Sequence, residues 1–241
     1  MMAELQGQVA LVTGSSRGIG RGIAEGLAQA GAHVVLTARD GDALEEVRRG
    51  IASRGGKASW VAADLAQEEE VDALFARVVA EQGRLDVLVN NAGLGLFGPL
   101  ADFPTGDFDR LIAVNLKAVF LCCRQAVRLM APRRQGYIIN ISSVVGFKGY
   151  PNQAAYTATK HGVMGITKSL AVEAQPHGIR VSAVLPGGVD TSLAAAGRPD
   201  LDRSVLLQPQ DIAQAVLYLL SLSERAAVDE IYIRRRSSAP F

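Results

Sequence analysis

The sequence contains little that suggests a disulfide framework, a membrane or a nucleic acid. Of 241 residues only Cys122 and Cys123 are cysteines, and they are adjacent within an apolar helical pattern, which favours buried thiols in a reducing compartment. No apolar run approaches the roughly 18 residues of a membrane-spanning helix, and the first residues leave no room for a signal peptide. The 25 Lys and Arg residues nearly balance the 24 Asp and Glu residues. We therefore expect a cytoplasmic protein that binds neither nucleic acid nor a membrane.

A metal site is not expected either. His161 and His177 do not stand at the spacing that metal ligands require, and no cluster of His, Cys, Asp and Glu accompanies them.

What the sequence does contain is a regular alternation of short β-branched runs with segments of helical periodicity. Strands that read as nearly continuous apolar runs, each followed by a helix, predict a parallel sheet covered on both faces. The fold class is therefore α/β, doubly wound, in a single domain over residues 1–241, with ligands at the carboxyl ends of the strands. Only the segment at about 190–209 changes in composition, and we expect it to be a mobile connection. The predicted strands are residues 9–13, 33–38, 58–63, 86–91, 136–142 and 180–186.

Three glycines follow the first predicted strand, in the stretch TGSSRGIG. Gly14, Gly18 and Gly20 stand where the chain turns from strand into helix, so backbone N–H groups there can approach a pyrophosphate. Glycines are also needed for tight turns and close helix packing, and this simpler interpretation competes with a nucleotide site. The position, after a first strand and at the start of a helix, favours the nucleotide site.

Tyr156 and Lys160 in the stretch YTATK lie four residues apart, on one face of a predicted helix. A free phenol has a pKa near 10, so its ionisation at pH 7 costs about 4 kcal/mol. An ammonium about 4 Å away contributes about 4 kcal/mol at an effective dielectric constant near 20. The pair therefore suits proton exchange with a substrate oxygen. An ordinary surface pair is the alternative interpretation.

Six segments resemble, in order and spacing, the short-chain dehydrogenase/reductase family over about residues 7–222: TGSSRGIG, NNAG, VN, ISS, YTATK and PGGVDT. The resemblance implies a Rossmann-type sheet of about seven strands in the order 3-2-1-4-5-6-7. It also implies hydride transfer between a nicotinamide cofactor and a small carbonyl or alcohol substrate. Within the family the chain resembles 3-oxoacyl-thioester reductases and related carbonyl reductases.

The resemblance assigns catalytic roles to four side chains. Tyr156 would be the acid/base, and Lys160 would bond the nicotinamide ribose and make the tyrosine more acidic. Ser143 would donate to the substrate oxygen; Ser142 competes for this role, but adjacent residues at a strand end point to opposite faces. Asn115 would hold a water that relays protons to Lys160, or alternatively would satisfy helix backbone at a bend.

The choice of cofactor depends on charge after the second predicted strand. Ala38 occupies the position where NAD-binding relatives place an acid, and Arg39 follows it. Arg39 and Arg17, within the glycine loop, would face a 2′-phosphate, which favours NADP(H). Asp40 leaves NAD(H) open as the alternative, and exposed charges at a turn are the simpler interpretation of both arginines.

Further cofactor contacts are implied by the resemblance at the ends of the later strands. A plain turn is the alternative interpretation of NNAG, and an ordinary N-cap is that of Thr191. The implied residues are Ser16 and Ile19 in the glycine loop, Asp64 and Leu65 at the adenine, Asn91, Ala92 and Gly93 at its ribose, and Pro186, Gly187, Val189 and Thr191 at the nicotinamide.

The carboxyl terminus departs from the family pattern. A glycine-rich end is replaced by the arginine run 234–236, which puts the usual tetramer contacts in doubt and is most simply a solvated terminus. The resemblance implies a homo-oligomer, dimer or tetramer, formed through residues 116–130 and 152–174. A catalytically silent nucleotide sensor or scaffold of the same fold is the alternative function, and a methyl-donor enzyme has no use for the Tyr156 and Lys160 pair.

Overall fold

The computed structural model describes residues 3–197 and 202–239, and its centre is one parallel sheet of seven strands. The strand order is β3-β2-β1-β4-β5-β6-β7, which confirms the predicted doubly wound sheet and its order. The crossover between β3 and β4 brings the two halves of the sheet together at β1 and β4, which pair directly. The strands are β1 (Val9–Thr13), β2 (His33–Ala38), β3 (Lys57–Ala62), β4 (Val87–Asn90), β5 (Gly136–Ile141), β6 (Ile179–Pro186) and β7 (Glu230–Ile233).

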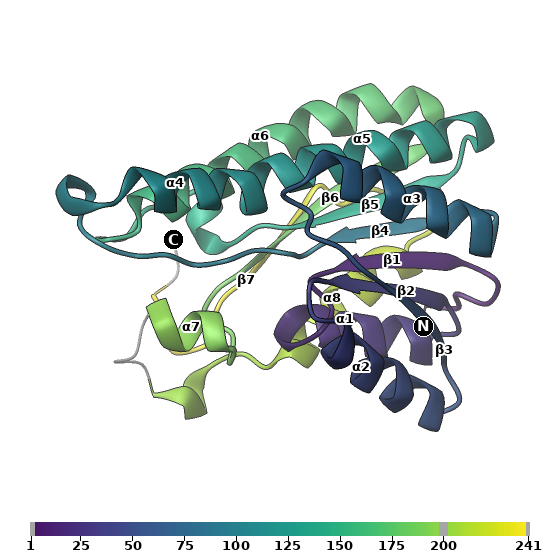
Figure 1. The fold of residues 1–241 in the computed structure, drawn as a ribbon, viewed down its shortest axis with the longest axis horizontal. Coiled ribbons are helices and arrows are strands. Elements are labelled where there is room, and N and C mark those ends of the chain that lie inside the picture. Colours follow the sequence, from purple (N-terminus) through teal and green to yellow (C-terminus); the bar gives the residue numbers. More distant parts are fainter. Residues whose placement is uncertain (1–2, 198–201, 240–241) are drawn as a thin grey trace.

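Helices cover both faces of this sheet (Figure 1). The helices α1, α2 and α8 lie on one face, and α3, α5 and α6 lie on the other, while α4 and α7 extend past the carboxyl ends of the strands. The helices are α1 (Gly18–Gln29), α2 (Gly41–Ser53), α3 (Glu68–Gln82), α4 (Thr105–Ile112), α5 (Ala118–Met130), α6 (Ala154–Ala174), α7 (Ser192–Gly197) and α8 (Pro209–Ser221).

The alternation of side chains along each strand produces two hydrophobic cores. In β1, Ala10 and Val12 pack with α1, α2 and α8, whereas Val9 and Leu11 pack with α3 and α5. Both sets are buried, because a parallel strand in this position has a helical layer on each face. Continuous apolar runs in the sequence are thereby explained.

The two cysteines are buried in α5 and are not joined in a disulfide. Cys123 Sγ lies 3.2 Å from Asn90 Nδ2, which donates to it from β4. Burial raises the pKa of both thiols, that of Cys123 to about 12. The prediction of buried thiols is confirmed, and both are core-packing residues.

The segment after β6 is tied at its base. The backbone N of Asp190 donates to Leu207 O at 2.7 Å, and Leu207 N donates to Gly188 O at 3.0 Å. Arg203 Nε also donates to Asp190 Oδ1 at 2.8 Å. The expected mobile connection at 190–209 therefore has fixed ends and carries α7; residues 198–201 within it lie outside the described residues.

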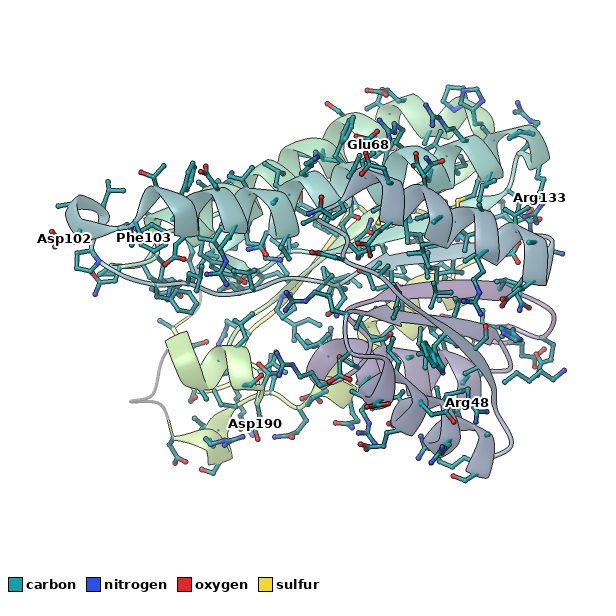
Figure 2. All side chains as sticks on the ribbon, in the orientation of Figure 1. Arg48, Glu68, Asp102, Phe103, Arg133 and Asp190 are labelled. Atoms are coloured by element: carbon teal, nitrogen blue, oxygen red, sulfur yellow. The ribbon has the colours of Figure 1, made fainter. Side chains whose placement is uncertain are left out.

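A buried carboxylate fixes the amino ends of the central strands β1 and β4. Asp86, which is 5% exposed, accepts from Val9 N at 2.9 Å, from Arg84 Nη2 at 2.6 Å and from Arg133 Nη2 at 2.8 Å. Burial opposes ionisation of Asp86, but the hydrogen bonds from Arg84, Arg133 and Val9 outweigh it and lower the pKa of the carboxyl. Figure 2 shows Arg133 at the end of the molecule away from Phe103 and Asp190.

We predict that Asp86→Asn lowers the free energy of unfolding by about 2–3 kcal/mol at pH 7, because two guanidinium groups lose their charged acceptor in a partly buried site. The folded-state pKa lies below the unfolded value near 3.9, so this stabilisation is present above about pH 4 and is lost as the pH falls through the folded-state pKa. Urea denaturation of the wild type and the variant, at pH 7 and at a pH below about 4, measures the difference in the free energy of unfolding. The exposed Asp109→Asn variant is the control, and equal effects of the two substitutions would contradict the prediction.

Candidate active site

The glycine loop and the end of β4 are packed together so closely that side chains are excluded. Gly14 has φ +63°, and a Cβ placed on it would lie 2.8 Å from Ala92 Cα. A Cβ on Gly20 would lie 2.3 Å from Gly14 O. Both glycines are thus required by the turn itself, and the same geometry leaves bare backbone at the amino end of α1, where an anion is stabilised.

Thr13 and Asn91 join the ends of β1 and β4. Thr13 Oγ1 accepts from the backbone N of both Asn91 and Ala92, each at 2.9 Å. The Asn91 amide donates back to Thr13 O at 2.9 Å and to Gly14 O at 3.2 Å. The Asn91 side chain therefore holds the glycine loop in place. Sequence reasoning missed Thr13, although it is the first residue of the TGSSRGIG stretch.

Tyr156 and Lys160 are both buried on one side of α6, with exposed fractions of 8% and 5%. Lys160 Nζ donates to Ile141 O at the end of β5 at 3.0 Å and lies 5.8 Å from the centroid of the Tyr156 ring. Among the described residues, Ile141 O is the only hydrogen-bond acceptor of this ammonium, which leaves it with donors to spare.

Burial shifts the pKa values of both members of the pair. Burial raises the pKa of Tyr156 to about 12, although a hydrogen bond with Ser143 opposes the rise. Burial likewise lowers the pKa of Lys160 to about 8. Desolvation is therefore the largest effect on both groups in the protein without cofactor, and the acidifying effect of Lys160 on the phenol stays a prediction. At pH 7 the tyrosine carries its proton and the lysine its charge.

The two serines after β5 point in different directions. Ser142 is buried and its Oγ donates to the backbone O of Lys160 at 3.2 Å. Ser143 is half-buried, and its Oγ accepts from Val145 N at 3.3 Å at the start of a short 3-10 helix. Ser143 is thus the serine beside the Tyr156 phenol, and Ser142 supports the backbone of α6.

Asn115 is fully buried in a π-helical segment, Ala113–Lys117, between α4 and α5. Its Oδ1 accepts from Leu94 N at 2.8 Å, and its Nδ2 donates to Leu94 O at 2.9 Å and to Thr159 Oγ1 at 3.3 Å. These bonds use both N–H donors and one acceptor position of the side-chain amide, so Asn115 fixes the segment after β4. A single π-helical turn of this kind is often found at functional sites.

A group of apolar side chains surrounds Tyr156, and we call it the Tyr156 cluster. The ring of Phe97 meets the Tyr156 ring edge to face, with 5.5 Å between centroids. Apart from Tyr156 itself, the members of the cluster lie outside the motifs, so the motifs gave no signal for them. The members of the cluster are Leu94, Leu96, Phe97, Phe103, Leu111, Val144, Val145, Ala155, Tyr156 and Tyr232.

The two arginines expected at the cofactor are both exposed. Arg17 precedes α1 and Arg39 follows β2, and neither forms an ion pair with another described residue. Asp40 does not pair with Arg39, because its Oδ1 caps α2 by accepting from Ala43 N at 3.1 Å. Further along the same edge, Asp64 Oδ1 accepts from Ala66 N at 3.1 Å, and Leu65 is buried.

The loop after Pro186 lies against the end of β7. Gly187 N donates to Ile233 O at 2.6 Å, and Val189 is buried. Thr191 Oγ1 accepts from Ala194 N at 3.3 Å in the first turn of α7, so the N-cap interpretation of Thr191 describes its contact here. The methyl group of Thr191 also lies 3.2 Å from a Cβ placed on Gly18, which brings this loop to the glycine loop.

These residues fit a dinucleotide. The glycine loop offers backbone that a Cβ would fill, and the buried Lys160 ammonium has unused donors at the carboxyl ends of β4, β5 and β6. Within residues 3–197 and 202–239, no three His, Cys, Asp or Glu side chains are grouped so that they could hold a metal ion. None of the helices in the described part of the chain is long and apolar enough to cross a membrane.

Sequence comparison identifies the family. The family model of the short chain dehydrogenases matches residues 8–202. The chain is 39% identical over 230 residues to the 3-oxoacyl-[acyl-carrier-protein] reductase FabG of Aquifex aeolicus, covering 92% of this chain and 93% of the relative. The protein therefore belongs to the short-chain dehydrogenase/reductase family of oxidoreductases, as the motifs indicated.

Two further relatives show the range of this family. A 3beta-hydroxysteroid dehydrogenase of Mediterraneibacter gnavus is 39% identical over 202 residues, covering 83% of this chain and 73% of the relative. A solved structure of a metagenomic short-chain oxidoreductase in complex with NADP is 43% identical, with a TM-score of 0.86, covering 97% of this chain and 99% of that one. The fold is thus shared with this chain, while the names of the relatives differ in the activity they give.

We predict that Gly20→Ala lowers the free energy of unfolding by about 2 kcal/mol or more, because the added Cβ would overlap Gly14 O and force the two chain segments apart. Gly106→Ala in α4 is the matched control, since nothing lies within 4 Å of its added Cβ. Thermal and urea unfolding of both variants measure the difference. A Gly20 variant as stable as the Gly106 variant would refute the close packing of this turn.

Proposed function

We propose that the protein reduces a carbonyl compound with NADPH, with Tyr156 as the proton donor. The observation that carries this proposal is the buried Lys160 ammonium beside Tyr156, which has Ile141 O as its acceptor among the described residues. A buried charge with unused donors costs stability, and its retention is best explained by a ligand that completes its hydrogen bonds.

A bound nicotinamide would supply hydride to the carbonyl carbon, and the chain's own groups would stabilise the charge that develops on the carbonyl oxygen. Tyr156, protonated at pH 7 because burial raises its pKa to about 12, donates its proton to that oxygen. Ser143 lies beside the phenol and donates to the same oxygen. The positive charge of Lys160 stabilises the phenolate that remains, and Asn115 fixes the neighbouring chain through Leu94.

The raised pKa of Tyr156 means that the protein without cofactor holds a protonated phenol at pH 7. A neutral phenol is ready to give a proton, whereas alcohol oxidation would require it to be ionised first. A catalytically silent sensor is less well supported, because a buried phenol and a buried ammonium next to Ser143 would serve no purpose in it.

The preference for NADP(H) over NAD(H) is supported by charge at the adenosine end. Arg17 and Arg39 are exposed cations without an ion-pair partner among the described residues, and Asp40 is engaged as the cap of α2. A 2′-phosphate would neutralise both guanidinium groups. The solved relative that contains NADP agrees with this choice.

A homo-oligomer is also part of the proposal, and it rests on an apolar groove between α5 and α6. Ile112, Leu116, Phe120 and Ile166 line this groove together with Gly162, and Phe120 is 51% exposed. A second copy would bury these side chains. Both a dimer and a tetramer remain within this proposal, because the carboxyl terminus departs from the family pattern. The cytoplasmic location stays a prediction.

We predict that Tyr156→Phe lowers kcat for reduction of any accepted ketone by a factor of at least about 1,000, because the proton donor is removed while the ring contact with Phe97 remains. NADPH absorbance measures turnover, and NADPH fluorescence measures binding. The dissociation constant for NADPH should stay within about threefold of the wild-type value. Turnover close to that of the wild type would remove Tyr156 from the mechanism.

We predict that Arg17→Ala and Arg39→Ala each raise KM for NADPH about tenfold, which corresponds to about 1.4 kcal/mol per guanidinium contact. KM for NADH should change little, because NADH has no 2′-phosphate. Steady-state kinetics with both cofactors measure the effect, and Arg49→Ala, an exposed arginine of α2, is the control. Equal changes for NADPH and NADH would contradict the role given to these arginines.

A further inference from the structure

Lys148 is surrounded by three aromatic rings at the edge of the active site. Its Nζ lies 5.9 Å from the ring centroid of Phe147, 5.7 Å from that of Tyr150 and 5.9 Å from that of Tyr232. The hydroxyl groups of Tyr232 and Tyr150 raise the pKa of Lys148. A long, flexible side chain is thereby held in one place with its charge kept.

The position of this charge is set by Tyr232. Its ring meets the Phe147 ring edge to face, with 5.1 Å between centroids. Tyr232 also belongs to the Tyr156 cluster, where it packs against the buried members. Phe147 itself ends the short 3-10 helix that begins after Ser143. The ammonium of Lys148 therefore lies at the border of the Tyr156 cluster, beside Tyr232.

A second cation lies where β7 ends. The sequence suggested a solvated arginine run, but Arg234 and Arg235 are half-buried and only Arg236 is exposed. Arg234 Nη1 donates to Ser238 O at 2.6 Å and so closes the terminal turn. Arg235 instead lies over the loop after Pro186, with its Nε 3.3 Å from a Cβ placed on Gly188.

These two cations lack a carboxylate partner in the described part of the chain. The acids of the neighbouring elements are engaged: Glu230 pairs with Lys168, and Asp190 pairs with Arg203. Lys148, in the segment after β5, borders the Tyr156 cluster at Tyr232, and Arg235, in the segment after β7, borders the loop after β6 at Gly188. An apolar surface bordered by two unpaired cations suits a ligand with an apolar part and a negative charge.

We propose that the substrate is an oxo acid, whose carboxylate lies at Lys148 and Arg235 while its carbonyl lies at Tyr156. This inference rests on the proposed reductase function and adds the charge of the substrate to it. The two cations act as specificity residues: they orient the carboxylate, and the Tyr156 cluster contacts the carbon chain between the two groups.

The test compares each oxo acid with its own methyl ester, using acetoacetate, levulinate and longer oxo acids, by NADPH absorbance. The wild type should prefer at least one acid over its ester by about tenfold or more in kcat/KM, and the preference should shrink as salt is added. Lys148→Met and Arg235→Gln should each abolish most of this preference by raising KM for the acid, while kcat/KM for the ester stays unchanged. Lys148→Arg should retain the preference, because a guanidinium keeps the charge and stacks on the same rings.

Arg236→Gln is the matched control, because it removes an exposed charge from the same tail, and it should behave as the wild type. Equal kcat/KM values for acids and esters in the wild type would overturn the inference while the reductase function stands. An equal loss in Arg235→Gln and Arg236→Gln would also overturn it, because a general surface charge would then explain the preference. If the protein reduces no oxo acid, no ester and no simple ketone, the proposed function is overturned together with the inference.

Discussion

The burial of one ammonium, that of Lys160, is the constraint on which the site depends. Its Nζ is held by Ile141 O at the end of β5, and burial lowers its pKa to about 8. Because the unfolded value is near 10.4, the charged lysine costs on the order of 3 kcal/mol of stability below about pH 8, and this cost disappears as the pH rises toward 10.4. The fold tolerates the cost because two complete cores flank the sheet. A ligand that accepts from the unused donors would recover part of it.

The parallel sheet explains why so many functional groups meet at this one edge. The glycine loop follows β1, Asn91 follows β4, Ser143 follows β5, and Pro186 ends β6, so all of them lie at carboxyl ends. Direct bonds join these segments: Thr13 and Asn91 connect the first two, and Lys160 connects α6 to β5. At the amino ends of the strands, Asp86 pairs with Arg84 and Arg133, and this cluster stabilises the fold and contains none of the candidate catalytic residues. The stabilising ion pairs and the candidate catalytic groups therefore lie at opposite ends of the strands.

The sequence predicted the fold because the relevant signals are local. Apolar runs of strand length predicted the parallel sheet, and the family resemblance implied its strand order. The strand ends are shifted by one residue at β3, β4, β5 and β6. What could not be predicted depends on contacts between distant segments. The hydroxyl of Thr13, the amide of Asn115 bound to Leu94, and the rings of Phe97 and Tyr232 have no distinctive spacing. The rise of the Tyr156 pKa on burial could not be predicted for the same reason, since spacing alone does not show how completely a helix face is buried.

The most direct test of this account is the pKa of Lys160 in the protein without cofactor. NMR titration of isotope-labelled lysine side chains follows each ammonium, and the signal that is missing in Lys160→Met identifies the one of interest. The account predicts a midpoint at about pH 8 for Lys160, well below the value near 10.4 of a lysine in an unfolded chain. A Lys160 midpoint near 10.4 would contradict it, because the ammonium would then be solvated and would have no unused donors to offer a ligand.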